Sequence, residues 1–274
     1  MSTDALRVLV LGDSTAFTDA TGPQLPDAPQ LYPNVLRRDL ERTLERPIDL
    51  TVVASPGATV REAYRSVTKD RHVQFDLLAR ADALVVAIGS FDHAPAGVPP
   101  SVQAVLPYVR PLRLRRRLRT GLHATYPRLV TLRRGHGSRT PRGEFLRLYA
   151  DLLDHLRSVT WGRAAGVALG PTSHRSDYYG QRHPGHARAE ARQLAQARAH
   201  GFAAVPVWSR VLDHLDALND DGIHWPAAVH AAVGVDVAAA LLPQLTGEAP
   251  TTGLPAAYQE HLEAYEAAAA ADEE

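Results

Sequence analysis

The 274-residue chain contains no cysteine, only one methionine and, at Lys69, a single lysine. The lack of cysteine excludes disulfide scaffolds, cysteine nucleophiles, iron–sulfur clusters and zinc sites built on thiolates. The sequence has no stretch of 18 uninterrupted apolar residues and no basic N-terminal segment followed by an apolar core. We therefore expect no membrane span and no secretion signal, and the default location is the cytoplasm.

Neither sign of charge is in excess, because 30 arginine and lysine residues balance 30 aspartate and glutamate residues. This balance argues against a general nucleic-acid-binding protein. Hydrophobic residues make up 45% of the chain and charged residues 22%, which is typical of a folded globular protein. A chain of this length has room for one large domain or two small ones.

Short apolar runs alternate with longer amphipathic segments along the chain. The apolar runs predict five buried strands, at residues 6–11, 48–54, 83–88, 165–169 and 203–208. The amphipathic segments predict helices at residues 31–44, 144–159, 184–200 and 227–242. The alternation favours a parallel sheet, and strands that are apolar throughout indicate that helices cover both of its faces.

Two segments break this alternation. Residues 110–142 hold eleven arginines and no acidic residue, and we interpret residues 95–142 as an arginine-rich insertion or lid. Residues 247–274 are predicted to be a linker, up to Gly253, and then an alanine-rich, acidic helical tail. Residues 1–246 are predicted to form the main domain, which includes this insertion.

Ser14 stands at the end of the first predicted strand, in Gly12-Asp13-Ser14. Open α/β sheets bind ligands at the carboxyl ends of their strands, so a small nucleophile at this place is a catalytic candidate. A helix starting soon afterwards would also put Ser14 near a positive helix end, where an anion is favoured. The alternative is that Ser14 caps a strand-to-helix turn.

A second signal, Asp221-Gly222-Ile223-His224, lies just before the last of these helices. On a tight turn, this spacing lets the Asp221 carboxylate reach one imidazole nitrogen of His224 while the other nitrogen points outward, which fixes the tautomer and stabilises the imidazolium. Asp220 is a competing partner for the imidazole. The alternative assigns Asp221 to a turn and His224 to the surface.

Together, these motifs resemble the SGNH, or GDSL-type, hydrolases through Gly12-Asp13-Ser14, Gly57 and Asp221-x-x-His224. The resemblance implies a flavodoxin-like, three-layer α/β/α sandwich with a central parallel sheet of about five strands. It also implies that Ser14 is the nucleophile, His224 the general base and Asp221 the group that orients it. The backbone N–H groups of Ser14 and Gly57 would form the oxyanion hole, although Gly57 also fits an ordinary Pro-Gly turn.

One element of that family pattern is incomplete. Where those hydrolases have Gly-x-Asn-Asp, this chain reads Gly89-Ser90-Phe91-Asp92, and Phe91 cannot donate a hydrogen bond from its side chain. Loss of one oxyanion donor typically costs about 10²–10³ in rate, so either Ser90 or a nearby N–H group substitutes, or the site is slow or inactive. Asp92 is either a contact for a hydroxylated acceptor or a loop cap.

A closer resemblance is to the diglucosylglycerate octanoyltransferases of actinobacteria, a branch of the same fold. The matching segments lie between about residues 7 and 245 and include residues 8–17, 32–34, 57–61, 90–92, 108–116, 173–174, 177–180 and 221–225. This resemblance implies transfer of a medium-chain acyl group, octanoyl, from an acyl-CoA or acyl carrier to a hydroxyl of a glucosylglycerate-type glycoside. It implies an acyl-enzyme on Ser14 and no cofactor.

The arginine-rich segment offers partners for substrate anions. Guanidinium groups suit phosphates and carboxylates, so Arg110, Arg113 or a neighbouring arginine is a candidate contact for the donor or for a glycerate carboxylate. The alternative is a solvated basic helix face. The leucines interleaved with these arginines, at positions 112, 114 and 118, are expected to pack.

Further candidates for substrate binding are Asp13, beside the nucleophile, and His174, which follows the fourth predicted strand. A surface loop histidine is the alternative for His174. His183 and His186 lie in a loop near Asp177, but no third ligand is defined, so no metal site is predicted.

Two other functions remain open from the residues. An esterase or deacetylase would use the same serine, histidine and aspartate with water as the acceptor. A sugar-binding protein that keeps the fold without catalysis would explain Phe91, but the intact set of Ser14, Asp221 and His224 argues against it.

Overall fold

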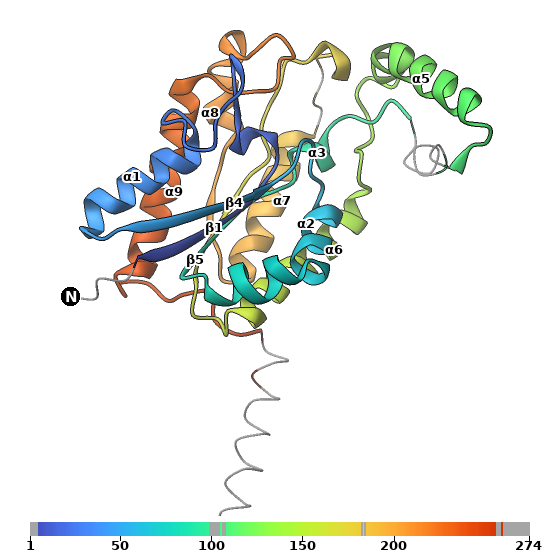
Figure 1. Ribbon diagram of the computed structural model, residues 1–274. Coiled ribbons are helices and arrows are strands. Elements are labelled where there is room, and N and C mark those ends of the chain that lie inside the picture. Colours follow the sequence, from blue (N-terminus) through green and yellow to red (C-terminus); the bar gives the residue numbers. More distant parts are fainter. Residues whose placement is uncertain are drawn as a thin grey trace, which may run out of the picture.

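The computed structural model describes residues 5–98, 105, 108–181, 183, 185–255 and 259. Its centre is a five-stranded parallel sheet in the order β4-β1-β5-β6-β7 (Figure 1). The strands are β1 (Leu6–Gly12), β4 (Ile48–Ala54), β5 (Ala83–Ala87), β6 (Ala165–Leu169) and β7 (Ala203–Val205). A small antiparallel hairpin, β2 (Thr18–Asp19) with β3 (Gly22–Pro23), follows β1.

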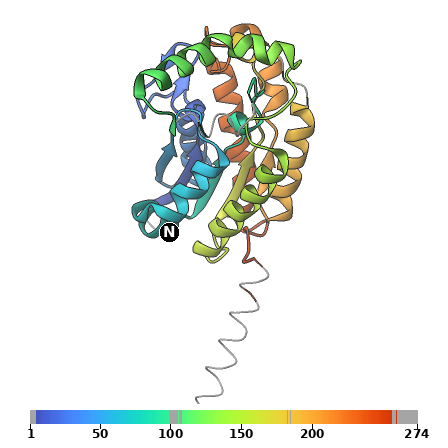
Figure 2. The same cartoon turned by 90° about the vertical axis from the view of Figure 1, so that its right-hand side faces the viewer.

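Helices cover both faces of the sheet and complete three layers (Figures 1 and 2). One face carries α1 (Tyr32–Leu44) and α9 (Ala227–Leu245), and the other carries α2 (Val60–Lys69), α6 (Arg142–Val159) and α7 (His186–Ala199). Strand β1 feeds both cores, because successive strand side chains point to opposite faces: Val8 and Val10 lie in the first core, Leu9 and Leu11 in the second. The predicted three-layer sandwich is confirmed.

All five predicted strands and all four predicted helices are present; β4 and β6 have the predicted bounds, and the others have one or both ends shifted by one to three residues. The residue predicted to start the third helix, at position 184, lies outside the described residues. Helix α2 was not predicted, although the sequence contains its start signal. The Thr59 side chain accepts a hydrogen bond from the Glu62 N–H, and the Glu62 carboxylate accepts one from the Thr59 N–H, which is a capping box.

Helix α9 is long and apolar enough to cross a membrane by length and composition alone. Its inner side chains, however, are completely buried: Val229, Val233 and Val237 belong to the core between the sheet and α1. Helix α9 therefore has the composition of a central core helix, which passes the same test.

Within the segment predicted as an insertion lies α5 (Leu112–Leu132), which stands away from the body in Figure 1 and crosses the top of the molecule in Figure 2. Its C-terminal half packs through Tyr126 and Val130 on an apolar cluster that includes Ala94 and Tyr179. Its N-terminal half does not pack in this way. The leucines there are exposed, contrary to expectation: Leu112, Leu114 and Leu118.

Residues 249–255, here called the C-terminal strap, pack on the body where a linker was predicted up to Gly253. The Arg157 guanidinium donates hydrogen bonds to the carbonyl oxygens of Gly253 at 2.8 Å and Leu254 at 2.7 Å. A Cβ at Gly166 would lie 2.3 Å from the Thr252 side chain, so the strap rests on a position that only glycine can fill. The strap is thus held against the main domain, and most of the predicted tail lies outside the described residues.

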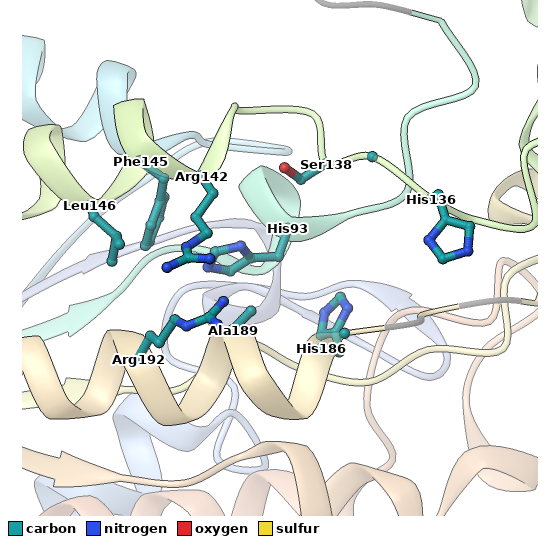
Figure 3. Close-up of a pocket in the computed structure, with 11 residues that line it drawn as sticks. His93, His136, Ser138, Arg142, Phe145, Leu146, His186, Ala189 and Arg192 are labelled. Atoms are coloured by element: carbon teal, nitrogen blue, oxygen red, sulfur yellow. The ribbon is translucent and has the colours of Figure 1, made fainter.

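Helices α6 and α7 run antiparallel to the strands, so both begin at the carboxyl edge of the sheet. A cavity of about 230 Å³ opens between their first turns (Figure 3). The turn α3 (Ser90–His93), which directly follows β5, contributes to its wall through His93. This cavity is called the α6–α7 cavity below.

Candidate active site

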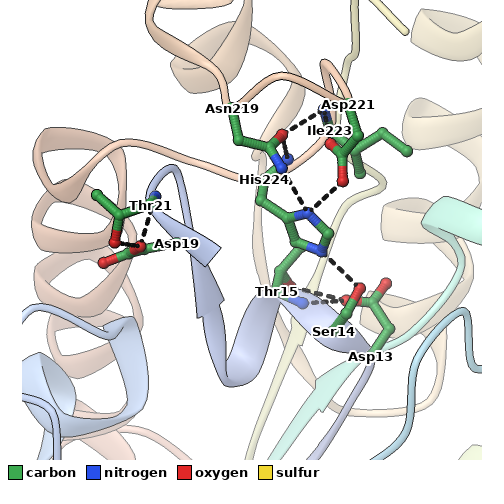
Figure 4. Close-up of polar contacts among 9 residues, drawn as sticks. All are labelled: Asp13, Ser14, Thr15, Asp19, Thr21, Asn219, Asp221, Ile223 and His224. Carbon is green, nitrogen blue, oxygen red and sulfur yellow. Dashed lines mark hydrogen bonds and ion pairs between the residues drawn. The ribbon is translucent and has the colours of Figure 1, made fainter. Parts of the chain in front are cut away.

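Segments from opposite ends of the sequence bring Ser14 and His224 together at the carboxyl edge of the sheet (Figure 4). The Ser14 hydroxyl oxygen lies 2.9 Å from His224 Nε2, and His224 Nδ1 lies 2.9 Å from the Asp221 carboxylate. Both are hydrogen-bond distances, and the order hydroxyl, imidazole, carboxylate is that of a nucleophile, its base and the group that orients the base. The structure thus brings the three predicted residues into one hydrogen-bonded series.

Ser14 begins a single 3₁₀ turn, Ser14–Ala16, directly after β1. The Asp13 carboxylate caps this turn and accepts hydrogen bonds from the Thr15 N–H at 2.9 Å and the Thr15 hydroxyl at 2.8 Å. No α-helix starts here, because the β2–β3 hairpin intervenes and α1 begins only at Tyr32. The expected helix end beside Ser14 is therefore absent, and His224 is the group that can activate the serine.

Asn219, which the sequence analysis missed, fixes the loop that carries His224. Its side-chain oxygen accepts hydrogen bonds from the N–H groups of His224 at 3.0 Å and Ile223 at 3.2 Å. Gly222 adopts a φ of 70°, and a Cβ there would lie 2.7 Å from neighbouring backbone, so only glycine closes this turn. The described structure contains no hydrogen bond between Asp220 and the imidazole. The run of asparagine, aspartates and glycine is a turn signal that could have identified the loop.

The pKa values of the Asp221 and Asp13 carboxyls are shifted in opposite directions. Partial burial raises the pKa of Asp221, but hydrogen bonds from His224 and Asn219 outweigh it and lower the pKa to about 2. Asp221 is therefore ionised at neutral pH and can hold the Nδ1 proton of the imidazole. Burial raises the pKa of Asp13, although its hydrogen bonds from Thr15 act in the opposite direction.

A cavity of about 150 Å³, here called the Ser14 cavity, opens in front of the hydroxyl. Much of its wall is apolar, with contributions from Phe91, Ala94, Tyr179 and Ile223. These residues belong to the same apolar cluster as Tyr126 and Val130 of α5. The site is thus an apolar hollow that ends at a candidate nucleophile and is backed by α5.

Phe91 packs its ring against Gly57. The φ of Gly57 is 63°, and a Cβ at this position would lie 3.1 Å from the ring. The Arg139 guanidinium lies over the same ring, 4.0 Å from its centroid, in a cation–π contact. The residue that stands in place of the family asparagine is therefore part of the apolar wall.

Ser14, Gly57 and Ser90, the predicted oxyanion-hole residues, all line the Ser14 cavity. The Ser90 hydroxyl oxygen accepts a hydrogen bond from the Thr172 N–H at 3.1 Å. This bond leaves the hydroxyl proton of Ser90 available for donation. Their role in stabilising an oxyanion stays a prediction.

Asp92 is completely buried and does not line the Ser14 cavity. Its carboxylate accepts hydrogen bonds from the N–H of Val60, the first residue of α2, at 2.8 Å and from the Thr140 hydroxyl. Burial raises its pKa to about 6, against the lowering effect of these two bonds. Asp92 therefore ties α2 to the loop before α6, the cap role that the sequence left open, and offers no contact to an acceptor.

His174 is buried and lines the Ser14 cavity. Its Nδ1 accepts a hydrogen bond from the Ser176 N–H at 3.4 Å, and its Nε2 has no hydrogen-bond partner in the described part of the chain. Burial lowers its pKa to about 4, so the ring is neutral at pH 7 and carries its hydrogen on Nε2. Contact between His174 and an acceptor hydroxyl stays a prediction.

The arginines at positions 110–117 are not brought to the Ser14 cavity. Arg110 and Arg113 are exposed, and no arginine of this segment lines the cavity wall. Contact between these two residues and an anionic substrate stays a prediction. Over the described residues, no cluster of three metal-binding side chains is found.

Solved structures of similar fold include the lipase/acylhydrolase from Enterococcus faecalis, with a TM-score of 0.56 over 87% of this chain and 95% of that chain, at 11% sequence identity. A protein described as an SGNH hydrolase, from Slackia heliotrinireducens, gives a TM-score of 0.51 over 86% of this chain and 99% of its own, at 18% identity. Identities this low show the fold alone. The chain has the fold of the SGNH/GDSL hydrolases, as predicted.

None of the known protein-family profiles matches the chain. Curated relatives include the diglucosylglycerate octanoyltransferase of Mycolicibacterium hassiacum, 31% identical over 229 residues, which cover 82% of this chain and 90% of that protein. The enzyme of the same name from Mycobacterium tuberculosis is 30% identical over 231 residues, 82% of this chain and 88% of that protein. The chain therefore belongs to the diglucosylglycerate octanoyltransferase family, and it is an acyltransferase.

Proposed function

We propose that this chain transfers a medium-chain acyl group, octanoyl, from a thioester such as an acyl-CoA to a hydroxyl of a glucosylglycerate-type glycoside. The observation that carries the proposal is the hydrogen-bonded series of Ser14, His224 and Asp221 at the end of an apolar cavity. The names of the relatives support the choice of acyl group and of acceptor class.

In the first half-reaction, His224 Nε2 takes the proton of the Ser14 hydroxyl as its oxygen attacks the thioester carbonyl. A carbon–oxygen bond forms, and the carbonyl oxygen becomes an oxyanion. The N–H groups of Ser14 and Gly57 stabilise it, and the Ser90 hydroxyl supplies a third donor. The carbon–sulfur bond then breaks, and the leaving sulfur takes the proton from His224. Ser14 is left as an ester of the acyl group.

In the second half-reaction, His224 takes the proton of the acceptor hydroxyl as that oxygen attacks the Ser14 ester. The product ester forms, the bond from the acyl carbon to Ser14 breaks, and the Ser14 oxygen recovers the proton from His224. The ionised Asp221 stabilises the imidazolium in both halves. We assign the neutral His174, with its unpartnered Nε2, to hydrogen bonding with the acceptor.

The apolar wall of the Ser14 cavity supports a medium-chain acyl group. Burial of each CH₂ group stabilises binding by about 0.8 kcal/mol, so shortening an octanoyl donor to butanoyl removes about 3 kcal/mol, or roughly a hundredfold in kcat/KM. An acyl chain that fills the hollow also keeps water from the Ser14 ester, which transfer requires.

The test is mass spectrometry of the products from octanoyl-CoA with diglucosylglycerate and related glycosides. Wild type is compared with Ser14→Ala and with Ser209→Ala, which changes an exposed serine on α8 (Trp208–Leu212) that does not line the cavity. We expect an acylated glycoside from wild type and Ser209→Ala and none from Ser14→Ala.

If free octanoate is the sole product and its release depends on Ser14, the proposal is wrong and the chain is an esterase that uses water as the acceptor. A fluorophosphonate probe separates the remaining case. If neither product forms and the probe does not label Ser14 in the native protein, the chain is a sugar-binding protein without catalysis.

A further inference from the structure

The α6–α7 cavity is lined by basic side chains, and no acidic side chain of the described residues faces it (Figure 3). Arg142 stands on the first turn of α6 and Arg192 on the second turn of α7. Figure 3 shows both guanidinium groups reaching into the same end of the cavity. Neither makes an ion pair or a hydrogen bond within the described part of the chain. Two like charges that share a cavity repel each other, so this arrangement favours a bound anion.

A buried histidine in the same cavity gives an independent observation. His186, the first residue of α7, is 3% exposed, and its ring points into the cavity in Figure 3. The ring donates a hydrogen bond to the backbone of Thr172, but Nε2 has no hydrogen-bond partner in the described structure. A buried polar atom without a hydrogen-bond partner destabilises the folded protein. A ligand hydroxyl that donates a hydrogen bond to Nε2 removes this penalty.

The two helix ends add to the positive potential. Both α6 and α7 begin at the cavity, and neither has a hydrogen bond from a side-chain cap, because their N-cap residues are Pro141 and Gly185. Uncapped first turns present backbone N–H groups with a partial positive charge. The arginines, the helix ends and the unpaired imidazole nitrogen thus converge on one hollow.

The α6–α7 cavity adjoins the candidate active site. The turn α3 supplies His93 to its wall, and Ser90 and Phe91 of the same turn line the Ser14 cavity. The rings of His186 and His174, one on each cavity, have centroids 6.0 Å apart. One layer of histidine side chains therefore separates the two hollows.

We propose that the α6–α7 cavity is an oxyanion subsite, in which Arg142 and Arg192 bind a carboxylate or phosphate and His186 Nε2 accepts a hydrogen bond from a hydroxyl of the same ligand. That the anion belongs to a substrate of Ser14 rests on the proposed function. Its two sources are then the carboxylate of a glycerate-type acceptor and the phosphates of a CoA donor. The subsite takes the anion-binding role that the sequence assigned to Arg110 and Arg113.

Binding is tested without turnover, in the full chain carrying Ser14→Ala. Isothermal titration calorimetry with sodium glycerate and with adenosine 3′,5′-bisphosphate separates the two sources. We expect one probe to bind, and Arg142→Gln or Arg192→Gln to weaken it roughly 10- to 100-fold, because each removes a charged hydrogen-bond donor. Arg188→Gln is the matched control, since Arg188 is exposed on the same helix and does not line the cavity. No binding of either probe, or an equal loss in Arg188→Gln, overturns the subsite.

Steady-state kinetics of the enzyme that retains Ser14 gives the second readout. Arg192→Gln should raise the KM of the acceptor if glycerate is the probe that binds, and the KM of the donor if the bisphosphate binds, at nearly unchanged kcat. Unchanged values of both KM constants would overturn the subsite while the transferase reaction stands. Arginine-dependent binding of a probe in a chain that shows no acyl transfer would support the subsite and refute the proposed function.

Discussion

Replacement of Asp92 by asparagine should flatten the pH dependence of stability. The Asp92 carboxyl is completely buried, and burial raises its pKa from 3.8 to about 6 against the hydrogen bonds from Thr140 and Val60. The folded state therefore binds this proton more tightly than the unfolded state does. The resulting contribution to stability is fully present below pH 3.8 and is lost as the pH rises through 6. The gap between the two pKa values corresponds to about 3 kcal/mol.

An asparagine keeps the shape of Asp92, can accept from the Val60 N–H and cannot ionise. Urea unfolding at a series of pH values should show most of this loss in wild type between about pH 4 and pH 7, and not in Asp92→Asn. The buried histidines are common to both proteins, so the difference between the two curves isolates Asp92. Asp213→Asn, an exposed carboxylate, is the control and should follow wild type. A wild-type minus Asp92→Asn difference that does not change with pH would refute the reasoning.

Asp221→Asn should lower the kcat of acyl transfer by about 10²–10⁴ with little change in KM, because the imidazolium loses its counter-charge while Asn219 still holds the loop; an effect confined to KM, in steady-state assays, would contradict this role. Gly57→Ala adds a methyl group 3.1 Å from the Phe91 ring at a φ of 63°, and should cost about 10² in kcat by displacing an oxyanion donor. Combination with Phe91→Leu should restore part of the rate, and no restoration would argue against the clash. Arg157→Ala removes two hydrogen bonds to the C-terminal strap and should lower the free energy of unfolding in urea by about 1–3 kcal/mol at unchanged kcat. A loss of activity without a loss of stability would show that the strap acts on the site.

The sheet was predictable because its strands are short and apolar on both faces. Residues 48–54 and 165–169 became β4 and β6 with the predicted bounds. Helix α2 was missed because its apolar residues are few, although the Thr59 and Glu62 capping pair marked its start. Residues 95–142 were interpreted as an insertion or lid, in which a helix was only one alternative, and the leucines of α5 were expected to pack. Amphipathic spacing predicts which residues share a face, but not whether another element covers that face.

At the site, Ser14, Asp221 and His224 could be predicted to lie together because the resemblance implied a role for each of them. Asn219 was not predicted because its side chain accepts hydrogen bonds from backbone N–H groups of its own loop. No residue spacing in the sequence marks such contacts. The sequence left two roles open for Asp92, acceptor contact and loop cap, and only its burial in the structure distinguishes them. Arg142, His186 and Arg192 were beyond prediction as a group, since they meet only because α6 and α7 begin side by side.

The separation of Ser14 and His224 by 210 residues has a consequence for the newly made chain. At synthesis rates of about 5–20 residues per second, the ribosome adds His224 roughly 10–40 s after Ser14. Strands β1, β4 and β5 can pair early in this interval, since all three lie in the first third of the chain. During this interval Ser14 lies at the edge of a partial sheet, and His224 is not yet present beside it. An incomplete chain therefore holds Ser14 without His224, and under the proposed mechanism it cannot transfer an acyl group until the segment that carries His224 has joined the fold.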